Sequence, residues 1–204
     1  GMGLRAAQLF ADEGAKVLAT SWNMENLEKN LAGYSENIVL FQLDVREEDQ
    51  WASAAAKAEE LWGKIDILVN NAGIAWFGLL TDMTDEDWSS LLQTNLSSVF
   101  YCCRAAIPHM VSVKCGRIIN ISSMWGTAGA SCEAAYSASK GAVNSLTKAL
   151  AKELAPSHIS VNGVSFGVID TDMNRCFDEE ERASLAEEIP YGRFASPEEA
   201  AAFC

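Results

Sequence analysis

Short apolar runs alternate with longer segments of helical periodicity along this chain. The runs rich in Val, Ile and Leu predict strands over Lys16–Ser21, Asn37–Leu43, Ile65–Asn70, Gly116–Ile121 and Ile159–Val164. The segments between them predict helices over residues 3–13, 24–32, 47–62, 85–111, 133–155 and 178–188. Strands that alternate with helices are typical of a parallel sheet with crossover helices. We therefore expect an α/β fold, a Rossmann-type doubly wound parallel sheet with helices on both faces.

The chain has 204 residues, which suits one α/β domain with a substantial core. No repeat, low-complexity tract or flexible linker divides it. Pro156 follows the predicted helix 133–155, where a stop signal is expected. We therefore expect residues 1–204 to form a single domain.

Acidic residues outnumber basic ones, 28 to 15, so the formal charge is −13. This balance argues against nucleic acids and anionic membranes as partners, because both attract a basic surface. No apolar run approaches the roughly 18–20 residues that span a bilayer. Residues 1–14 have the pattern of an amphipathic helix rather than a signal peptide, so we expect a cytoplasmic protein. The six cysteines form no CxxC pair, and we expect neither a metal site nor a disulfide.

The strongest local signal for chemistry is the sequence Tyr136-Ser-Ala-Ser-Lys140. Residues four apart on a helix share one face, so the phenol and the ammonium point into the same space. A nearby cation favours the phenolate, which predicts a lowered pKa for Tyr136 and suits a general acid or base. The structural alternative is a packed tyrosine beside a lysine whose stem covers apolar surface.

Polar and small residues follow three of the predicted strands. Ser122 and Ser123 follow one strand, Asn70–Gly73 end another, and residues 160–172 form a third strand with a polar end. Ligands of open α/β sheets bind at the carboxyl ends of the strands. These residues are therefore candidates for a binding site shared with Tyr136 and Lys140.

Taken together, these motifs resemble the short-chain dehydrogenases/reductases. They are NNAG at 70–73, a serine 13 residues before the tyrosine of YxxxK, and VNxVxxGxIxT at 161–171. The resemblance covers essentially the whole chain. It implies an oxidoreductase that reduces a carbonyl to an alcohol with NAD(P)H.

The resemblance also implies four catalytic residues. Tyr136 would protonate the carbonyl oxygen, and Ser123 would donate a hydrogen bond to that oxygen. Lys140 would bind the nicotinamide ribose and lower the pKa of Tyr136. Asn95 matches the asparagine that holds a proton-relay water, although a plain helix amide is the alternative.

The implied cofactor contacts lie at the carboxyl ends of the strands. The pyrophosphate is expected where Gly1-Met2-Gly3-Leu4-Arg5-Ala6 matches the dinucleotide fingerprint G-x-G-x-x-A at a helix start. The full set is Gly1, Met2, Gly3, Ser21, Trp22, Asp44, Val45, Asn71, Ala72, Gly73, Tyr136, Lys140, Gly167, Val168 and Thr171. No carboxylate in residues 20–23 is present to hold a ribose 2′-hydroxyl, which favours NADP(H) over NAD(H). Phe166 replaces a usual proline, and we expect it to reshape the nicotinamide pocket.

Among subfamilies, the chain is most similar to the 3-oxoacyl-(acyl-carrier-protein) reductases, so a 3-oxoacyl thioester is the favoured substrate. Residues 129–133, GASCE, resemble instead a branch that includes the reductase of a 5-aminopentanone modification on elongation factor P. A catalytically silent, nucleotide-binding or structural member of the fold is the alternative of another class.

Helices 85–111 and 133–155 are expected to pair in a homotetramer, as they do in the family.

The resemblance places the first and last strands of the family's sheet outside these residues. We expect a strand before Gly1 and another after Cys204, and we expect residues 1–204 alone to fold and bind dinucleotide poorly. The reason is that the first strand lies in the middle of such a sheet. Without it, two neighbouring strands would leave backbone donors and acceptors unpaired.

Overall fold

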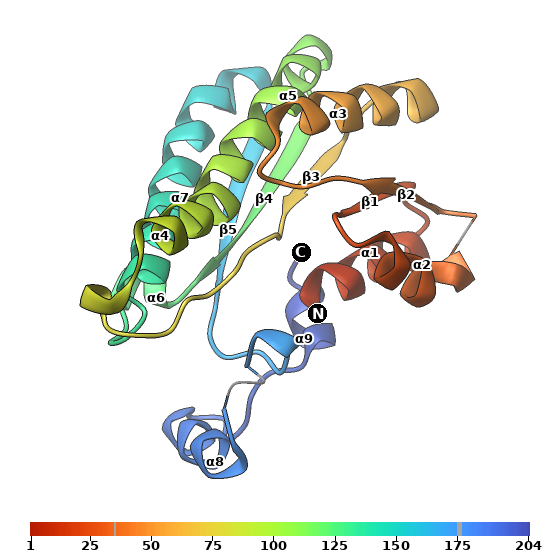
Figure 1. Cartoon of the computed structure of the whole chain (residues 1–204). Coiled ribbons are helices and arrows are strands. Elements are labelled where there is room, and N and C mark those ends of the chain that lie inside the picture. The colour runs from red at the N-terminus through yellow and green to blue at the C-terminus, as the bar shows by residue number, and fades with distance from the viewer. Residues whose placement is uncertain (35, 175–176) are drawn as a thin grey trace.

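The structure, a computed structural model, describes residues 1–34, 36–174 and 177–204. Figure 1 shows its elements along the chain. The strands are β1 (Val17–Ser21), β2 (Ile38–Gln42), β3 (Ile67–Asn70), β4 (Gly116–Ser123) and β5 (Ile159–Phe166). The α-helices are α1 (Met2–Asp12), α2 (Met24–Leu31), α3 (Glu48–Trp62), α4 (Asp85–Leu92), α5 (Ser98–Val113), α6 (Trp125–Ala128), α7 (Ala134–Leu154), α8 (Glu179–Glu188) and α9 (Pro197–Ala201).

The described strands form two parallel sheets, β1-β2 and β3-β4-β5. Within the described part of the chain, no backbone pairing joins β1 to β3. This break lies where the expected strand before Gly1 would pair. That strand and the single-domain organisation stay predictions.

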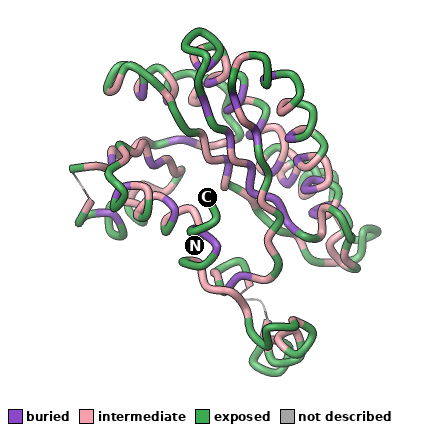
Figure 2. The backbone as a smooth tube through the Cα atoms, turned by 180° about the vertical axis from the view of Figure 1, so that it is seen from behind, coloured by how far each residue is buried: buried purple, intermediate pink, exposed green. Residues whose placement is uncertain are grey.

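Helices cover both faces of the strands, so the expected α/β fold is confirmed. In Figure 1, α5 and α7 run along β3-β4-β5, while α1 and α2 lie beside β1-β2. The main core fills the space between α5, α7 and the larger sheet, with Met110, Ile118 and Val143 almost fully buried. Figure 2 shows buried segments along these strands and on the inward sides of the helices. A smaller core joins α1 and α2 to β1 and β2.

A buried polar chain fixes α7 against the larger sheet. The Asn70 side-chain amide donates to Asn120 Oδ1 at 2.8 Å, and the Asn120 amide donates to Thr147 Oγ1 at 2.8 Å. Thr147 in turn donates to the Val143 carbonyl at 2.7 Å. Because these groups are buried and mutually satisfied, they specify how β3, β4 and α7 fit together.

The predicted helix 85–111 is wrong in one respect, because it is not continuous. Residues Gln93–Ser97 form a π-helical turn between α4 and α5. Such a turn inserts an extra residue into the helix, often at a functional site. Here it contains Asn95, whose buried amide bonds to another segment of the chain. The hydrophobic pattern on either side of this turn is helical, so the pattern could not reveal that the turn is π-helical.

Candidate active site

Ser123 and Tyr136 meet at the carboxyl end of the larger sheet. Ser123 is the last residue of β4, and Tyr136 lies in the first turn of α7. Ser123 lies near enough to the Tyr136 phenol for its hydroxyl to affect the pKa of that group. Ser123 Oγ also accepts from the Trp125 backbone N–H at 3.2 Å, which fixes the hydroxyl. Tyr136 packs in a buried cluster with Leu91 and Ala135.

The pKa of Tyr136 is raised, not lowered as the sequence pattern predicted. Burial is the main cause, because it disfavours the phenolate. The hydrogen bond from Ser123 opposes this shift, and the negative charge of Glu133 adds to it. Tyr136 is therefore held in its protonated form, the form that a general acid needs.

Lys140 is buried one helical turn after Tyr136. Its ammonium donates to the Ile121 carbonyl at 2.9 Å and lies 5.8 Å from the centre of the Tyr136 ring. Burial lowers the pKa of Lys140 to about 8. The ammonium also faces Gly73, where an added Cβ would lie 3.3 Å from Lys140 Nζ. The sequence motif therefore does bring the phenol and the ammonium to one place.

Asn95 joins the loop after β3 to α7. Its side-chain amide donates to the Ile74 carbonyl at 2.9 Å and to Ser139 Oγ at 3.1 Å, while its Oδ1 accepts from the Ile74 N–H at 2.8 Å. An added Cβ at Gly73 would lie 3.4 Å from Asn95 Oδ1. Asn95 thus reaches the vicinity of Lys140 and fixes the loop around it. Its expected relay water stays a prediction.

A close approach of α6 holds α7, the helix of Tyr136 and Lys140, in place. A Cβ at Gly126 would lie 2.7 Å from the Lys140 backbone carbonyl carbon and 2.9 Å from the Gly141 nitrogen. Because backbone cannot move aside as a side-chain end can, only glycine fits here without displacing α7. The sequence analysis did not single out Gly126.

The start of α1 meets the expected cofactor loops. A Cβ at Gly3 would lie 2.5 Å from Asn71 Nδ2, and one at Gly1 would lie 3.9 Å from Thr171. An open pocket of about 180 Å³ runs beside this helix start. Its lining is Gly1, Leu4, Ser21, Asn26, Leu27, Asn30 and Asp172. The helix N-terminus and the side chains of Ser21, Asn26 and Asn30 suit the phosphates and ribose of a dinucleotide, while Asp172 adds a carboxylate to the same lining.

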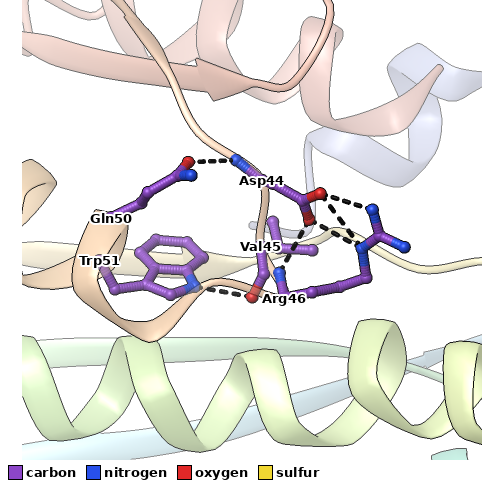
Figure 3. A network of polar contacts seen from close by, with 5 residues as sticks. All are labelled: Asp44, Val45, Arg46, Gln50 and Trp51. Atoms are coloured by element: carbon purple, nitrogen blue, oxygen red, sulfur yellow. Dashed lines mark hydrogen bonds and ion pairs between the residues drawn. The ribbon is translucent and has the colours of Figure 1, made fainter.

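A second open pocket, of about 380 Å³, is lined by Trp22, Gln42, Asp44 and Gln50. Figure 3 shows the loop that borders it. The Asp44 N–H donates to Gln50 Oε1 at 2.7 Å, and the Asp44 carboxylate forms an ion pair with Arg46 at 2.6 Å. This ion pair and its hydrogen bonds hold the pKa of Asp44 below its usual range.

The other residues expected to contact the cofactor lie on the neighbouring loops and helix start. The Trp51 indole donates to the Val45 carbonyl at 3.0 Å, which fixes the loop after β2 (Figure 3). Met2 opens α1, and Ala72 lies between Asn71 and Gly73 after β3. Gly167 and Val168 follow β5, and the Val168 carbonyl accepts from the Ala195 N–H at 3.1 Å.

Phe166, which replaces the proline usual in the family, is the last residue of β5. The Phe166 carbonyl accepts a hydrogen bond from the Met124 N–H at 2.8 Å. A Cβ at the next residue, Gly167, would lie 3.5 Å from Met124 Sδ. The segment after β5 is thus held close to the segment that follows Ser123.

Sequence reasoning missed the two glutamines of the larger pocket and the Arg46 and Trp51 contacts. Gln42 and Gln50 lie at the end of β2 and in the first turn of α3, and neither belongs to a motif. The only available signal was their position beside the carboxyl end of a strand.

No group of three or more metal-ligating side chains occurs in residues 1–34, 36–174 and 177–204. Cys176, one of the six cysteines, lies outside these residues. None of the helices described is both long and apolar enough to cross a membrane.

Comparison with known proteins identifies the family. A family model described as short chain dehydrogenase matches residues 1–182. The chain belongs to the short-chain dehydrogenase family. The resemblance drawn from the motifs is thereby confirmed, and with it an oxidoreductase that acts on a CH–OH group with NAD(P).

This short-chain dehydrogenase is similar to several 3-oxoacyl-(acyl-carrier-protein) reductases. FabG of Thermotoga maritima is 39% identical over 204 residues, covering 98% of this chain and 83% of the relative. FabG of Escherichia coli is 38% identical over 202 residues, covering 98% of this chain and 82% of the relative.

The chain is also similar to solved structures over its whole length. ElxO with NADP bound is 33% identical, with a TM-score of 0.93 over 100% of this chain and 85% of the other. A gluconate 5-dehydrogenase from Burkholderia cenocepacia, in complex with NADP and tartrate, is 34% identical. Its TM-score is 0.91 over 100% of this chain and 83% of the other.

Proposed function

We propose that this short-chain dehydrogenase uses NADPH to reduce a ketone to a secondary alcohol, with Tyr136 as the general acid. The observation that carries the proposal is the gathering of Ser123, Tyr136 and the buried Lys140 ammonium at the carboxyl end of β4. When bound, the reduced nicotinamide supplies a hydride to the carbonyl carbon. Tyr136 donates its proton to the carbonyl oxygen, and Ser123 hydrogen-bonds the same oxygen as negative charge develops there.

The cofactor is proposed to occupy the two pockets and the loops between them. Gly1, Met2, Gly3 and Asn71 would hold the pyrophosphate, while Ala72, Gly73 and Lys140 would meet the nicotinamide ribose. The carboxyl end of β1 presents Ser21 and Trp22 and no carboxylate. That feature favours NADP(H), and the NADP-bound structural relatives support the same preference.

The proposal is tested by following oxidation of NADPH and NADH with a panel of ketones that includes an acetoacetyl thioester. We expect turnover with at least one ketone and a higher kcat/KM with NADPH. A catalytically silent protein would bind a dinucleotide but oxidise it with no member of the panel. That result would favour the alternative of a nucleotide-binding or structural role.

A 3-oxoacyl thioester is the first substrate candidate, because 3-oxoacyl-(acyl-carrier-protein) reductases are relatives. The charges around the site do not add support for an acidic carrier protein. Arg117 lies at the opposite end of β4 from Ser123, about 20 Å away. Lys152 lies 12 residues beyond Lys140 on α7, about 18 Å along the helix. A third cation, Arg104 of α5, is paired with Glu48.

An amine-bearing ketone, such as the 5-aminopentanone modification on elongation factor P, is the second candidate. The observation that favours it is Glu133, which immediately precedes α7 and whose charge acts on Tyr136. Among the described residues its partly buried carboxylate has no hydrogen-bond or ion-pair partner. A substrate ammonium would supply one.

Changing Glu133 to Gln should move the pH profile of ketone reduction. Glu133 raises the pKa of Tyr136, so its removal lowers that pKa. Tyr136 must be protonated to act as the acid, and the rate therefore falls as pH rises through its pKa. In Glu133→Gln this fall should begin at lower pH than in the wild type.

The measurement is kcat/KM as a function of pH, with Glu153→Gln near the far end of the same helix as control. The control should keep the wild-type profile. If the fall in kcat/KM at high pH begins at the same pH as in the wild type, or at a higher pH, in Glu133→Gln, the result would contradict the role given to Tyr136.

We also propose a cytoplasmic homotetramer in which α4–α5 and α7 form two-fold interfaces. Phe100, Val111 and Val113 of α5 are exposed in the isolated chain, which supports an interface there. Light scattering should give four times the chain mass. An active monomer would contradict this proposal.

A further inference from the structure

Phe77 is an exposed aromatic residue on the loop that follows β3. It is 63% exposed, and its ring meets the ring of Phe177 edge to face, with the ring centroids 6.4 Å apart and the ring planes at 85°. Phe177 lies between β5 and α8, so the contact joins two segments that are far apart in the sequence. Figure 1 shows both segments at the end of the larger sheet where β4 and β5 end. The aromatic pair therefore lies at the end of the sheet that carries Ser123.

The loop that carries Phe77 is fixed beside Tyr136. Trp76 packs against the buried cluster that contains Tyr136. The Gly78 N–H donates to the carbonyl of Cys132, four residues before Tyr136, at 2.8 Å. A Cβ at Gly78 would lie 2.7 Å from Trp76 Cη2, so the backbone lies directly against the indole. Because both neighbours of Phe77 are held next to the site, Phe77 lies at the site as well.

The segment that carries Phe177 is held by polar contacts rather than by burial. Arg182 of α8 donates to the Asn174 carbonyl at 3.3 Å and forms an ion pair with Asp170 at 2.7 Å. None of the residues of α8 is buried. These contacts hold the start of α8, and with it Phe177, against the segment that follows β5.

The chain around Phe77 is apolar throughout. Residues 74–80 have the sequence IAWFGLL and carry no charged, hydroxyl or amide side chain, yet Leu79 and Leu80 are largely exposed as well. An exposed run of this kind is unfavourable in water unless another group covers it. No side chain of the run could compensate a buried charge, so the covering group gains most by being apolar. Because Phe77 adjoins the groups around Tyr136, we assign the covering group to the substrate.

We propose that Phe77 and Phe177 form a wall against which the ketone substrate places an apolar arm of several carbon atoms. The inference rests on the proposed reduction of a ketone and adds the chemical class of the substituent next to the carbonyl group. When the arm covers the Phe77 ring, apolar surface of both leaves water, and the gain in binding grows with the length of the arm. The wall takes no part in the transfer of hydride or proton.

Steady-state kinetics with a series of 3-oxoacyl N-acetylcysteamine thioesters tests the wall. In the wild type, kcat/KM should rise by up to about fourfold for each methylene added to the acyl chain, the gain from burying one methylene. The readout is the ratio of kcat/KM for an eight-carbon acyl chain to kcat/KM for a four-carbon chain. Phe77→Ala should lower this ratio by about tenfold, because most of the apolar surface of the wall is lost. Phe177→Ala should lower the ratio less, and Phe77→Leu should retain most of it, because leucine keeps an apolar side chain.

Phe203→Ala is the matched control, because Phe203 is an aromatic residue that is 76% exposed and lies beyond α9. It should keep the wild-type ratio. The Kd for NADPH and the thermal unfolding of each variant verify that a lower ratio does not come from a loss of the folded site.

Three results would overturn the wall. The first is an equal ratio in Phe77→Ala and the wild type. The second is a wild type that prefers an acyl chain with a terminal ammonium to the alkyl chain of the same length. The third is a lower oligomeric mass of Phe77→Ala in light scattering, which would assign the loop to a subunit contact. In all three cases ketone reduction by the wild type would stand, whereas a wild type that reduces no thioester and no simple ketone would overturn the proposed function itself.

Discussion

Replacing Tyr136 with Phe should lower kcat for ketone reduction by about 10²–10⁴-fold, the usual contribution of a general acid. The substitution removes the phenolic hydroxyl and keeps the ring that packs with Leu91 and Ala135. The Kd for NADPH should therefore stay within a few-fold of the wild type. Steady-state kinetics and calorimetric binding on the same preparation measure the two quantities.

The pattern of the loss matters as much as its size. An effect on the reaction with unchanged cofactor binding assigns the hydroxyl to the chemical step. A Tyr136→Phe protein with the wild-type kcat would show that another group donates the proton. Matched thermal unfolding of the two proteins verifies that the difference is not one of folding.

Replacing Lys140 with Met should give a different pattern, in which both binding and turnover are lost. Methionine fills a similar volume with flexible apolar atoms, so the packing of the buried site is largely kept. The ammonium is expected to hold the ribose hydroxyls, and hydrogen bonds to charged groups contribute about 1.5–3 kcal/mol. The Kd for NADPH should thus rise by at least about tenfold, and kcat/KM should fall further.

Lys148→Met is the matched control, because Lys148 is an exposed lysine on the same helix. It should keep the wild-type Kd and kcat/KM. The Ile121 carbonyl loses its donor in Lys140→Met, so a moderate loss of thermal stability is expected as well. Unchanged NADPH affinity in Lys140→Met would contradict the proposed ribose contact.

The sequence predicted the elements of this fold well because buried parallel strands and amphipathic helices have different periods. The strand predicted over Gly116–Ile121 was found, and it continues to Ser123. The π-helical turn at Gln93–Ser97 was missed, since it depends on Asn95 reaching Ile74, more than 20 residues earlier. A contact of that kind leaves no mark on the local hydrophobic pattern.

The candidate catalytic residues could be named from the sequence because their motifs follow one another in a fixed order along the chain, and their roles stay predictions. The pKa shifts of these residues could not be predicted from the sequence. The lowered pKa predicted for Tyr136 considered only the nearby cation, whereas burial is the largest cause of the pKa shift of both Tyr136 and Lys140. Gln42 and Gln50 could not be predicted, because only the fold brings the end of β2 to the start of α3 and Trp22.

The central claim is that the protein transfers hydride from NADPH to a ketone with the help of Tyr136. The most direct measurement uses NADPH deuterated at the transferring position and mass spectrometry of the alcohol formed. We predict one deuterium on the carbinol carbon of the wild-type product, and at least about 10²-fold less labelled product per unit time from Tyr136→Phe. An alcohol without deuterium, or equal labelled yields from the two proteins, would contradict the account.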